Sequence, residues 1–221
     1  MYVTNYMKRS PVTARPDDTI AEVKTLMANH HFRHLPVVGE NGRLLGMVTD
    51  RDVRSAYPSS VLDDRHGKDE LLKVGQTAIC EIMSYEVVFL PAFATLDDAL
   101  VLLDRHKIGA LPVVDGRHQV IGIFSIRDLI RAYTILFGLG ERGSALVGVK
   151  DDGRPRPLTR IVQALEEHDI HFSRLVRNKS GLSSGGPSAI SIRVNTMNLR
   201  AVHQALEEVG FVIDPMRPEK P

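Results

Sequence analysis

Two short steps in the sequence pair a hydroxyl with a carboxylate three residues later. Thr49 precedes Asp52, and Ser125 precedes Asp128, each after an apolar run. Where such a step joins a strand to a helix, unpaired N–H groups and the helix dipole favour an anion such as phosphate. The hydroxyl can donate to a phosphate or ribose oxygen, and the carboxylate can accept from both hydroxyls of a ribose cis-diol. The two steps therefore indicate ribonucleotide binding, since deoxyribose offers only one of those donors.

The same residue types are also good helix N-caps, which need no ligand at all. One isolated copy would favour that capping alternative, whereas two copies in register favour a ligand. Whether both copies would be occupied stays open. Four arginines close to the two steps could add charge-assisted contacts to phosphate: Arg51, Arg54, Arg127 and Arg131.

The two steps belong to an internal repeat that runs without a gap. The segment 35–38 (Leu-Pro-Val-Val) returns at 111–114, an offset of 76 residues (112 − 36). Chance similarity would not keep a single register over so long a stretch, so repetition organises this part of the chain. The same offset relates Met7 to Met83, Thr19 to Thr95, Gly46 to Gly122 and Asp52 to Asp128.

Each repeat predicts a strand, a helix, two further strands and a final helix. Short strands are expected at 12–13 and 87–89, and two apolar strands at 37–38 and 44–48, repeated at 113–114 and 120–124. Final helices are expected near Arg51 and Arg127. One such unit is too small to bury its own sheet, so two copies are expected to pack sheet against sheet.

The first helix of each repeat has a recognisable start. Thr19 with Glu22 fits a capping box, and Thr95 with Asp98 occupies the same places in the second repeat. The second of these helices should bury one stripe at positions i, i+3, i+4 and i+7: Leu96, Ala99, Leu100 and Leu103.

Composition excludes several classes of protein. The chain has 221 residues, a net charge of +1 and 43% apolar residues, so it offers no electrostatic footprint for nucleic acid or an anionic membrane. The single cysteine, Cys80, is expected to be a buried apolar residue. Residues 1–9 lack a signal-peptide core and the apolar runs are too short for a bilayer, which predicts a cytoplasmic protein. No motif for a catalytic residue is present.

His30, His31 and His34 could suggest a metal site, because the first and last are four residues apart on a predicted helix. No acidic ligand stands beside them and Pro36 ends the helix, so a solvated helix end or a phosphate-facing basic patch is favoured over a metal site. The mixed-charge run 63–70 is interpreted as a solvated loop leading into a helix.

The segments 46–52 (Gly-Met-Val-Thr-Asp-Arg-Asp) and 122–128 (Gly-Ile-Phe-Ser-Ile-Arg-Asp) resemble the CBS motif. Two CBS motifs form a Bateman module, here residues 1–60 and 61–140, of mixed α/β (α+β) fold. The resemblance implies a cleft for an adenine nucleotide (AMP, ADP or ATP) or another adenosyl compound. It also implies that the adenine lies against the first strand and the segment before the Pro-Val strand: Thr13, Ala14, Arg33, His34 and Ala110.

The last third of the chain changes pattern. Strands are expected at 145–149, 172–177, 189–194 and 211–213 and helices at 158–168 and 199–209, with a mobile Gly/Ser loop at 180–188. This βαββαβ order is the ferredoxin-like arrangement. Residues 144–216 therefore resemble an ACT domain, and the whole chain resembles acetoin-utilisation-type CBS–ACT proteins.

ACT domains commonly bind small effectors where two copies pair edge to edge. This chain has Gly153-Arg154-Pro155-Arg156-Pro157 where the family usually has a Pro-Gly loop, which favours a dimerisation role over an amino-acid site. Edge pairing in a homodimer would also protect an exposed sheet edge.

The leading hypothesis is thus a non-catalytic sensor. An adenine nucleotide would bind between the repeats and shift the population of states presented to the ACT-like domain or to a partner protein, such as a target enzyme. Two alternatives stay open: an enzyme acting on the bound nucleotide, and a structural dimer whose clefts are unoccupied.

Overall fold

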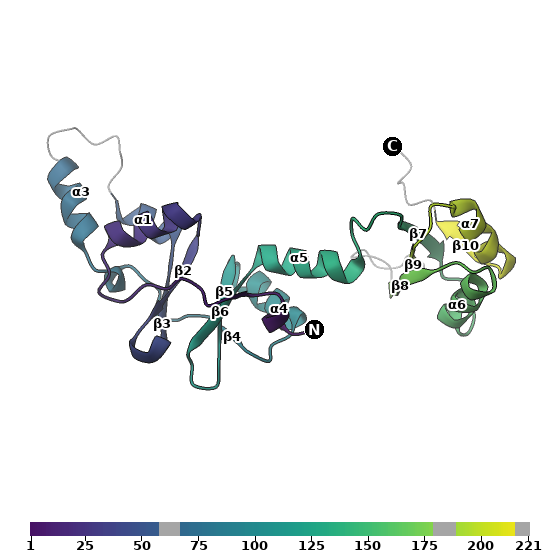
Figure 1. The fold of residues 1–221 in the computed structure, drawn as a ribbon, viewed down its shortest axis with the longest axis horizontal. Helices are drawn as coiled ribbons and strands as arrows, with labels where there is room; N and C mark the ends of the chain where they lie inside the picture. Colours follow the sequence, from purple (N-terminus) through teal and green to yellow (C-terminus); the bar gives the residue numbers. More distant parts are fainter. Residues whose placement is uncertain (58–66, 179–188, 215–221) are drawn as a thin grey trace. The chain divides into compact units, whose positions relative to one another are not determined.

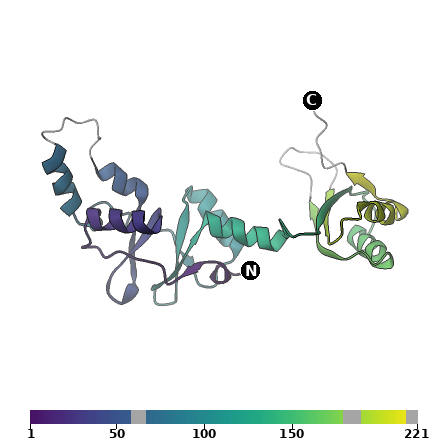
Figure 2. The same cartoon turned by 45° about the horizontal axis from the view of Figure 1, so that its top comes forward.

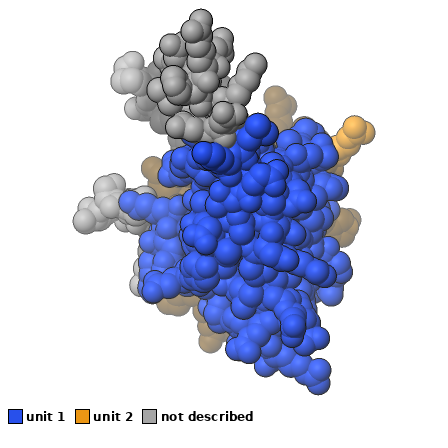
Figure 3. All heavy atoms as spheres, turned by 90° about the vertical axis from the view of Figure 1, so that its left-hand side faces the viewer, with its two compact units in different colours: residues 1–133 blue, residues 134–221 orange. Residues whose placement is uncertain are grey.

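The computed structural model describes residues 1–57, 67–178 and 189–214. The chain forms two compact units, Met1–Tyr133 and Thr134–Pro221, which Figure 3 distinguishes by colour. The first repeat contains β1 (Lys8–Arg9), α1 (Ile20–His30), β2 (His34–Val38), β3 (Leu44–Thr49) and α2 (Asp50–Ala56) (Figure 1). The second contains α3 (Gly67–Gln76), β4 (Leu90–Pro91), α4 (Leu96–His106), β5 (Ala110–Val114), β6 (Val120–Ser125) and α5 (Ile126–Phe137).

The strands of unit 1 form two sheets, one with the order β1-β6-β5-β4 and one hairpin of β2 and β3. Residues of β1, which precedes the first repeat's hairpin, pair with the second repeat, where Lys8 lies opposite Ile123. Conversely, Met47 on β3 forms a bridge with Ser84. The two repeats therefore exchange their leading segments instead of folding as independent copies.

The hydrophobic cores show the same exchange. Val3 and Met7 are buried in the core of the second repeat, whereas Ile79 and Met83 are buried in the core of the first. The members of each exchanged pair are separated by the repeat offset of 76 (79 − 3 and 83 − 7). Because each core is completed by the other repeat's leading segment, neither repeat buries its apolar surface alone.

Most predicted elements of the repeats are confirmed, but the first strands were predicted too early. Residues 12–13 and 87–89 are not in strands. The pairing begins at Ala14, which forms a parallel bridge with Val37, and at its counterpart Leu90 in β4, which pairs with Val113. The β-branched side chains of Val12 and Val88 line clefts instead, so their strand propensity is not used in a ladder.

The two predicted capping boxes are confirmed. Thr19 caps α1 with Glu22, and Thr95 caps α4 with Asp98. The predicted stripe on α4 is wrong at one position: Leu100 is 44% exposed, while Leu96, Ala99 and Leu103 are buried. The helix covers its core with a stripe narrower than the periodicity predicted. Of the charged run at 63–70, residues 63–66 lie outside the described part and the rest begins α3.

Unit 2 has the predicted βαββαβ order, which confirms the α+β fold class. Its elements are β7 (Ala145–Lys150), α6 (Pro157–Glu167), β8 (Phe172–Asn178), β9 (Ala189–Val194), α7 (Leu199–Glu208) and β10 (Val212–Asp214). The strands form an antiparallel sheet with the order β10-β7-β9-β8, and both helices cover one of its faces (Figures 1 and 2).

The helices of unit 2 begin as the sequence predicted. Pro157 is the first residue of α6, a position that does not need its missing N–H. Ile161, Leu165, Val202 and Leu206 point from α6 and α7 into the core. The predicted Gly/Ser loop at 180–188 lies outside the described residues. No helix within the described ranges is long and apolar enough to span a bilayer.

Candidate ligand clefts

Unit 1 contains two clefts of similar size that occupy equivalent places in the two repeats. The first, which we call the Thr49 cleft, has a volume of about 490 Å³, and the second, the Ser125 cleft, about 540 Å³. Both volumes are within the usual range for small-molecule sites. The offset of 76 relates most of their lining residues in pairs: Met47 and Ile123, Thr49 and Ser125, Asp50 and Ile126, Arg51 and Arg127, Ser84 and Lys8, Val87 and Pro11, Val88 and Val12, Lys107 and His31, Ile108 and Phe32.

Each cleft lies at a strand-to-helix junction with a complete capping box. The Thr49 hydroxyl donates to Asp52 Oδ2 at 2.7 Å, and the Asp52 backbone N–H donates back to that hydroxyl at 3.3 Å. The same bonds join Ser125 and Asp128, at 2.6 and 3.4 Å. Both steps are therefore real N-caps, as the capping alternative predicted.

The caps leave one oxygen of each carboxylate without a hydrogen bond, and of the two acids only Asp128 lines a cleft. Oδ2 of Asp128 accepts from the Ser125 hydroxyl and from the Ser125 backbone N–H, at 2.6 and 2.8 Å. Oδ1 has no hydrogen-bond partner in the described part of the chain, and Asp52 shows the same pattern. Oδ1 can accept a hydrogen bond from a ribose hydroxyl without breaking the cap, whereas the Ser and Thr hydroxyls already donate their proton to Oδ2.

A central wall separates the two clefts and lines both of them. It consists of Arg33 and His34 from the first repeat and Gly109 and Ala110 from the second. The carbonyl of Arg33 accepts from Asp50 N–H at 3.0 Å, and the carbonyl of Gly109 accepts from Ile126 N–H at 3.1 Å.

Glycine at position 109 makes room for this wall. A Cβ on Gly109 would lie 2.8 Å from Cε1 of His34, so the imidazole needs the absence of a side chain there. The first repeat has Arg33 at the matching position. The two halves of the wall therefore differ in their side chains, although their backbone hydrogen bonds are equivalent.

His34 is held in an environment that disfavours its charged form. Burial lowers the pKa of His34 below its ordinary value of 6.5, and the neighbouring charge of Arg33 lowers it further, while Asp52 acts in the opposite direction. The imidazole is thus a mainly neutral donor and acceptor between the clefts at pH 7.

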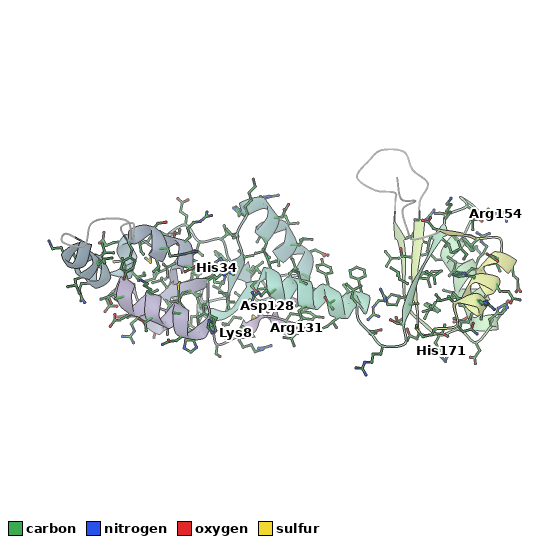
Figure 4. The ribbon with its side chains drawn as sticks, turned by 90° about the horizontal axis from the view of Figure 1, so that it is seen from above. Lys8, His34, Asp128, Arg131, Arg154 and His171 are labelled. Atoms are coloured by element: carbon green, nitrogen blue, oxygen red, sulfur yellow. The ribbon has the colours of Figure 1, made fainter. Side chains whose placement is uncertain are left out.

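Several elements bring polar side chains to the Ser125 cleft, among them Lys8 from β1, His34 from β2 and Asp128 from α5, which are labelled in Figure 4. The Lys8 ammonium lies 4.6 Å from the centre of the Phe32 ring, a cation–π contact. Phe32 also stacks on His30 with ring centres 5.1 Å apart. A flat apolar surface and a cation therefore lie beside one another at this cleft.

The structure brings most of the predicted site residues together. Arg33, His34 and Ala110 line both clefts, Thr49 and Arg51 line the first, and the second is lined by Ser125, Arg127 and Asp128. Thr13, Ala14 and Asp52 do not line either cleft.

Ala14 differs from the expectation for a clear reason. It is 1% exposed, and its backbone N–H and C=O are already bonded to Pro36 O and Val38 N–H, at 3.0 and 2.9 Å. Of the extra arginines, Arg54 lines the Thr49 cleft and Arg131 lines neither.

Sequence reasoning missed several lining residues, among them Lys8, Ser84 and Lys107. They lie in the exchanged leading segments and at the C-terminal ends of α1 and α4, far along the chain from the two motifs. The repeat offset was the signal that could have paired them, because Lys8 and Ser84 are 76 residues apart (84 − 8).

The three histidines are not arranged on one helical face. Helix α1 ends at His30, His31 has a left-handed backbone with φ of 56°, and His34 begins β2. Within the described residues, no three His, Cys, Asp or Glu side chains form a cluster that could hold a metal ion.

Comparisons with known proteins identify the repeats. A family model described as the CBS domain matches residues 3–59 and 79–135. The chain is 36% identical over 127 residues to the CBS domain-containing protein YhcV of Bacillus subtilis, covering 58% of this chain and 81% of that protein. It is 33% identical over 217 residues to the inosine-5'-monophosphate dehydrogenase of Mycobacterium tuberculosis, covering 92% of this chain but 38% of that protein.

Solved structures resemble part of the chain. A Vibrio cholerae protein ascribed to acetoin utilization (AcuB) is 31% identical with a TM-score of 0.53, covering 64% of this chain and 96% of that one. The CBS domain pair of protein MJ0100, solved in complex with 5'-methylthioadenosine and S-adenosyl-L-methionine, is 26% identical with a TM-score of 0.51, covering 62% and 98%.

Proposed function

The chain belongs to the CBS-domain family, and we propose that it is a non-catalytic regulatory protein whose two clefts bind adenosyl ligands. The observation that carries the proposal is the pairing of the clefts. Nine pairs of lining residues, separated by one offset, surround two cavities of similar volume, each beside a capped carboxylate.

The ligand class is supported by the groups at each junction. Oδ1 of the capping carboxylate suits a ribose hydroxyl, and apolar side chains such as Val88 and Phe32 offer flat contacts for a base. The related CBS pair of MJ0100 holds two adenosyl compounds. AMP, ADP, ATP and adenosyl thioether or sulfonium compounds are the candidates, with Thr13 and Ala14 in a supporting role behind the cleft wall.

We propose a regulatory and not a catalytic role. The match covers only 38% of the dehydrogenase's length, so it does not carry that enzyme's activity over to this chain. Ligand binding would act by differential affinity for two states of the protein, passed to a target protein or to unit 2.

Unit 2 is proposed to be an ACT-like module, residues 144–216, that mediates homodimer formation or takes a second effector. Its sheet ends in β8 on one side and β10 on the other, and edge-to-edge pairing would cover one of these edges. The repeat boundaries 1–60 and 61–140 are part of the same proposal.

The test is calorimetric titration of the full chain with AMP, ATP and S-adenosylmethionine. The matched variant is Asp52→Ala/Asp128→Ala, with Asp98→Ala, a capping acid outside both clefts, as control. We expect the unaltered protein and the control variant to bind at least one of these ligands. The double variant should lose that binding. Absence of heat with every ligand would contradict the proposal, and steady consumption of ATP would indicate an enzyme instead.

A further inference from the structure

The polar side chains of the central wall come from one repeat only. The offset of 76 pairs Arg33 with Gly109 and His34 with Ala110 (109 − 33 and 110 − 34). All four residues line both clefts. The two clefts therefore have one guanidinium in common, that of Arg33, and the second repeat supplies no matching cation.

The packing of the wall leaves no room for a second cation at position 109. A Cβ on Gly109 would lie 2.8 Å from Cε1 and 3.1 Å from Nε2 of His34. His34 is held by its pairing with Thr49 in the β2–β3 hairpin, and the Gly109 carbonyl accepts from the Ile126 N–H at 3.1 Å. Both partners of the close contact are thus fixed by backbone bonds, so the positive charge of the wall is restricted to Arg33.

His34 adds no second full charge to the wall at pH 7. Burial lowers the pKa of its imidazole below the ordinary value, and Arg33 lowers it further, against the opposing effect of Asp52. An anion that reaches the wall from either cleft therefore meets the charge of Arg33 and a mainly neutral imidazole.

The guanidinium of Arg33 is available to a ligand. The residue is exposed, and the described part of the chain forms no hydrogen bond or ion pair with its guanidinium. Arg54 of the Thr49 cleft, in contrast, is already bound to Asp50 at 2.6 Å. A bidentate interaction with phosphate uses the fork of the guanidinium once, so one phosphate at a time receives it in full.

Both clefts depend on this shared charge to the same extent. Four cations and two acids line the Thr49 cleft, and three cations and one acid line the Ser125 cleft, so each has a net charge of +2 when Arg33 is counted in both. Together the two clefts have six cations and three acids, a net charge of +3. The second phosphate-bearing ligand to bind therefore meets one positive charge fewer than the first.

We infer that the two clefts are negatively coupled through Arg33. A phosphate-bearing adenosyl ligand in one cleft engages the guanidinium and weakens the binding of a second such ligand in the other. This inference rests on the proposed function and adds its regulation. Because the coupling is reciprocal, it acts whichever cleft is filled first. The singly and doubly occupied proteins then form at different ligand concentrations, which widens the range over which a sensor responds.

The test is calorimetric titration of the full chain with AMP and, separately, with adenosine, which has no phosphate. Val12→Trp fills the Ser125 cleft and Val88→Trp fills the Thr49 cleft, at matching positions of the two repeats. Each of these single-cleft variants reports the affinity of the cleft that stays open. Arg33→Ala removes the shared cation. Arg51→Ala and Arg127→Ala are the matched controls, since each removes a cation that lines one cleft only.

We expect the unaltered protein to bind two AMP molecules. The product of its two binding constants should be about five- to tenfold below the product of the constants of the two single-cleft variants. Adenosine should show no such loss. Arg33→Ala should weaken AMP binding in both single-cleft variants and abolish the loss in the full chain, whereas each control should weaken one cleft and keep the loss.

If a tryptophan impairs folding, the ratio of the two AMP constants in the unaltered protein, compared with the ratio in Arg33→Ala and with that of adenosine, tests the same coupling. AMP constants that multiply without loss, or a loss that persists in Arg33→Ala, would overturn the inference and leave the proposed function intact. So would a protein that binds S-adenosylmethionine but not AMP, or AMP that binds only one of the folded single-cleft variants. Absence of heat with AMP, adenosine and S-adenosylmethionine alike would instead contradict the proposed function.

Discussion

Met83 packs against Gly46 so closely that a Cβ on the glycine would lie 2.5 Å from the methionine sulfur. Met83 belongs to the leading segment of the second repeat, whereas Gly46 is on β3 of the first. The reciprocal contact joins Met7 to Gly122 on β6. These two contacts hold the exchanged segments against β3 and β6, the strands that lead into the clefts.

We expect Gly46→Ala to destabilise the protein by about 1–3 kcal/mol, because the added methyl group overpacks a buried site. Met83 is 8% exposed, and Met83→Ala should cost about 2–5 kcal/mol by leaving a cavity. Since the shorter side chain makes room for the methyl group, the double variant should cost less than the sum of the two single changes.

Urea unfolding of the four proteins in this cycle measures the coupling. Gly116→Ala is the control, since nothing lies within 4 Å of a Cβ at that position. Strictly additive costs for Gly46→Ala and Met83→Ala would show that the contact between the two residues does not limit the packing.

The exchange of segments also explains which features of the fold the sequence could predict and which it could not. The capping boxes, the hairpins and the βαββαβ order depend on local patterns and on one register, and they were predicted correctly. The partners of Met7 and Lys8 depend on which repeat each leading segment joins, and a local pattern does not contain that information. The burial of Ala14 and the exposure of Leu100 are likewise set by neighbours distant in sequence.

The capping acids offer a second prediction, which separates stability from binding. Asp52→Ala should lower the stability of the ligand-free protein by about 1 kcal/mol, the usual worth of an N-cap interaction. Asp98→Ala, which breaks the equivalent bonds to Thr95 at 2.7 and 2.8 Å, should also lower the melting temperature. Only the Asp98 variant should then be stabilised by S-adenosylmethionine to the same extent as the unaltered protein.

Thermal unfolding with and without the ligand makes this comparison. Equal stabilisation of the Asp52 and Asp98 variants by the ligand would mean that the carboxylate at position 52 serves the helix cap alone.

A third prediction concerns the pH response of His34. Because its pKa in the folded protein is lowered by burial and by Arg33, the unfolded chain binds more protons below pH 6.5. Stability should therefore fall as the pH drops through 6.5, and His34→Gln should reduce that dependence. Arg33→Ala should raise the pKa of His34, and Asp52→Asn should lower it further, because Asp52 favours the charged imidazole.

Proton NMR of the His34 imidazole between pH 4 and 8 measures both changes in its pKa. This range contains the ordinary histidine pKa of about 6.5. Arg9→Ala serves as the control for the loss of one positive charge on an exposed surface. A pKa of His34 that does not change in Arg33→Ala would contradict the assigned repulsion.

The last prediction concerns Arg174, on β8 of unit 2, which binds the C-terminal end of α5. Its Nε donates to the carbonyl of Leu136, its Nη2 donates to the carbonyl of Ile135 at 2.9 Å, and both Nη atoms bind the Glu141 carboxylate at 3.1 and 3.2 Å. The last carbonyls of a helix have no partner within the helix. Arg174 therefore acts as a C-cap supplied from a strand distant in sequence.

We expect Arg174→Ala to cost about 1–3 kcal/mol, because it removes charge-assisted bonds from the Leu136 and Ile135 carbonyls and from the Glu141 carboxylate. Hydrogen exchange should become faster at the amides of Gly138 and Leu139, which donate to Ile135 O and Thr134 O at 3.2 and 2.9 Å. Arg174→Lys should recover only part of the loss, since an ammonium lacks the planar fork of donors. The exposed Arg200→Ala on α7 is the control and should leave these amides unchanged. Exchange at Gly138 and Leu139 that is equally slow in Arg174→Ala would show that the turn after α5 is held by its own backbone bonds and not by the guanidinium.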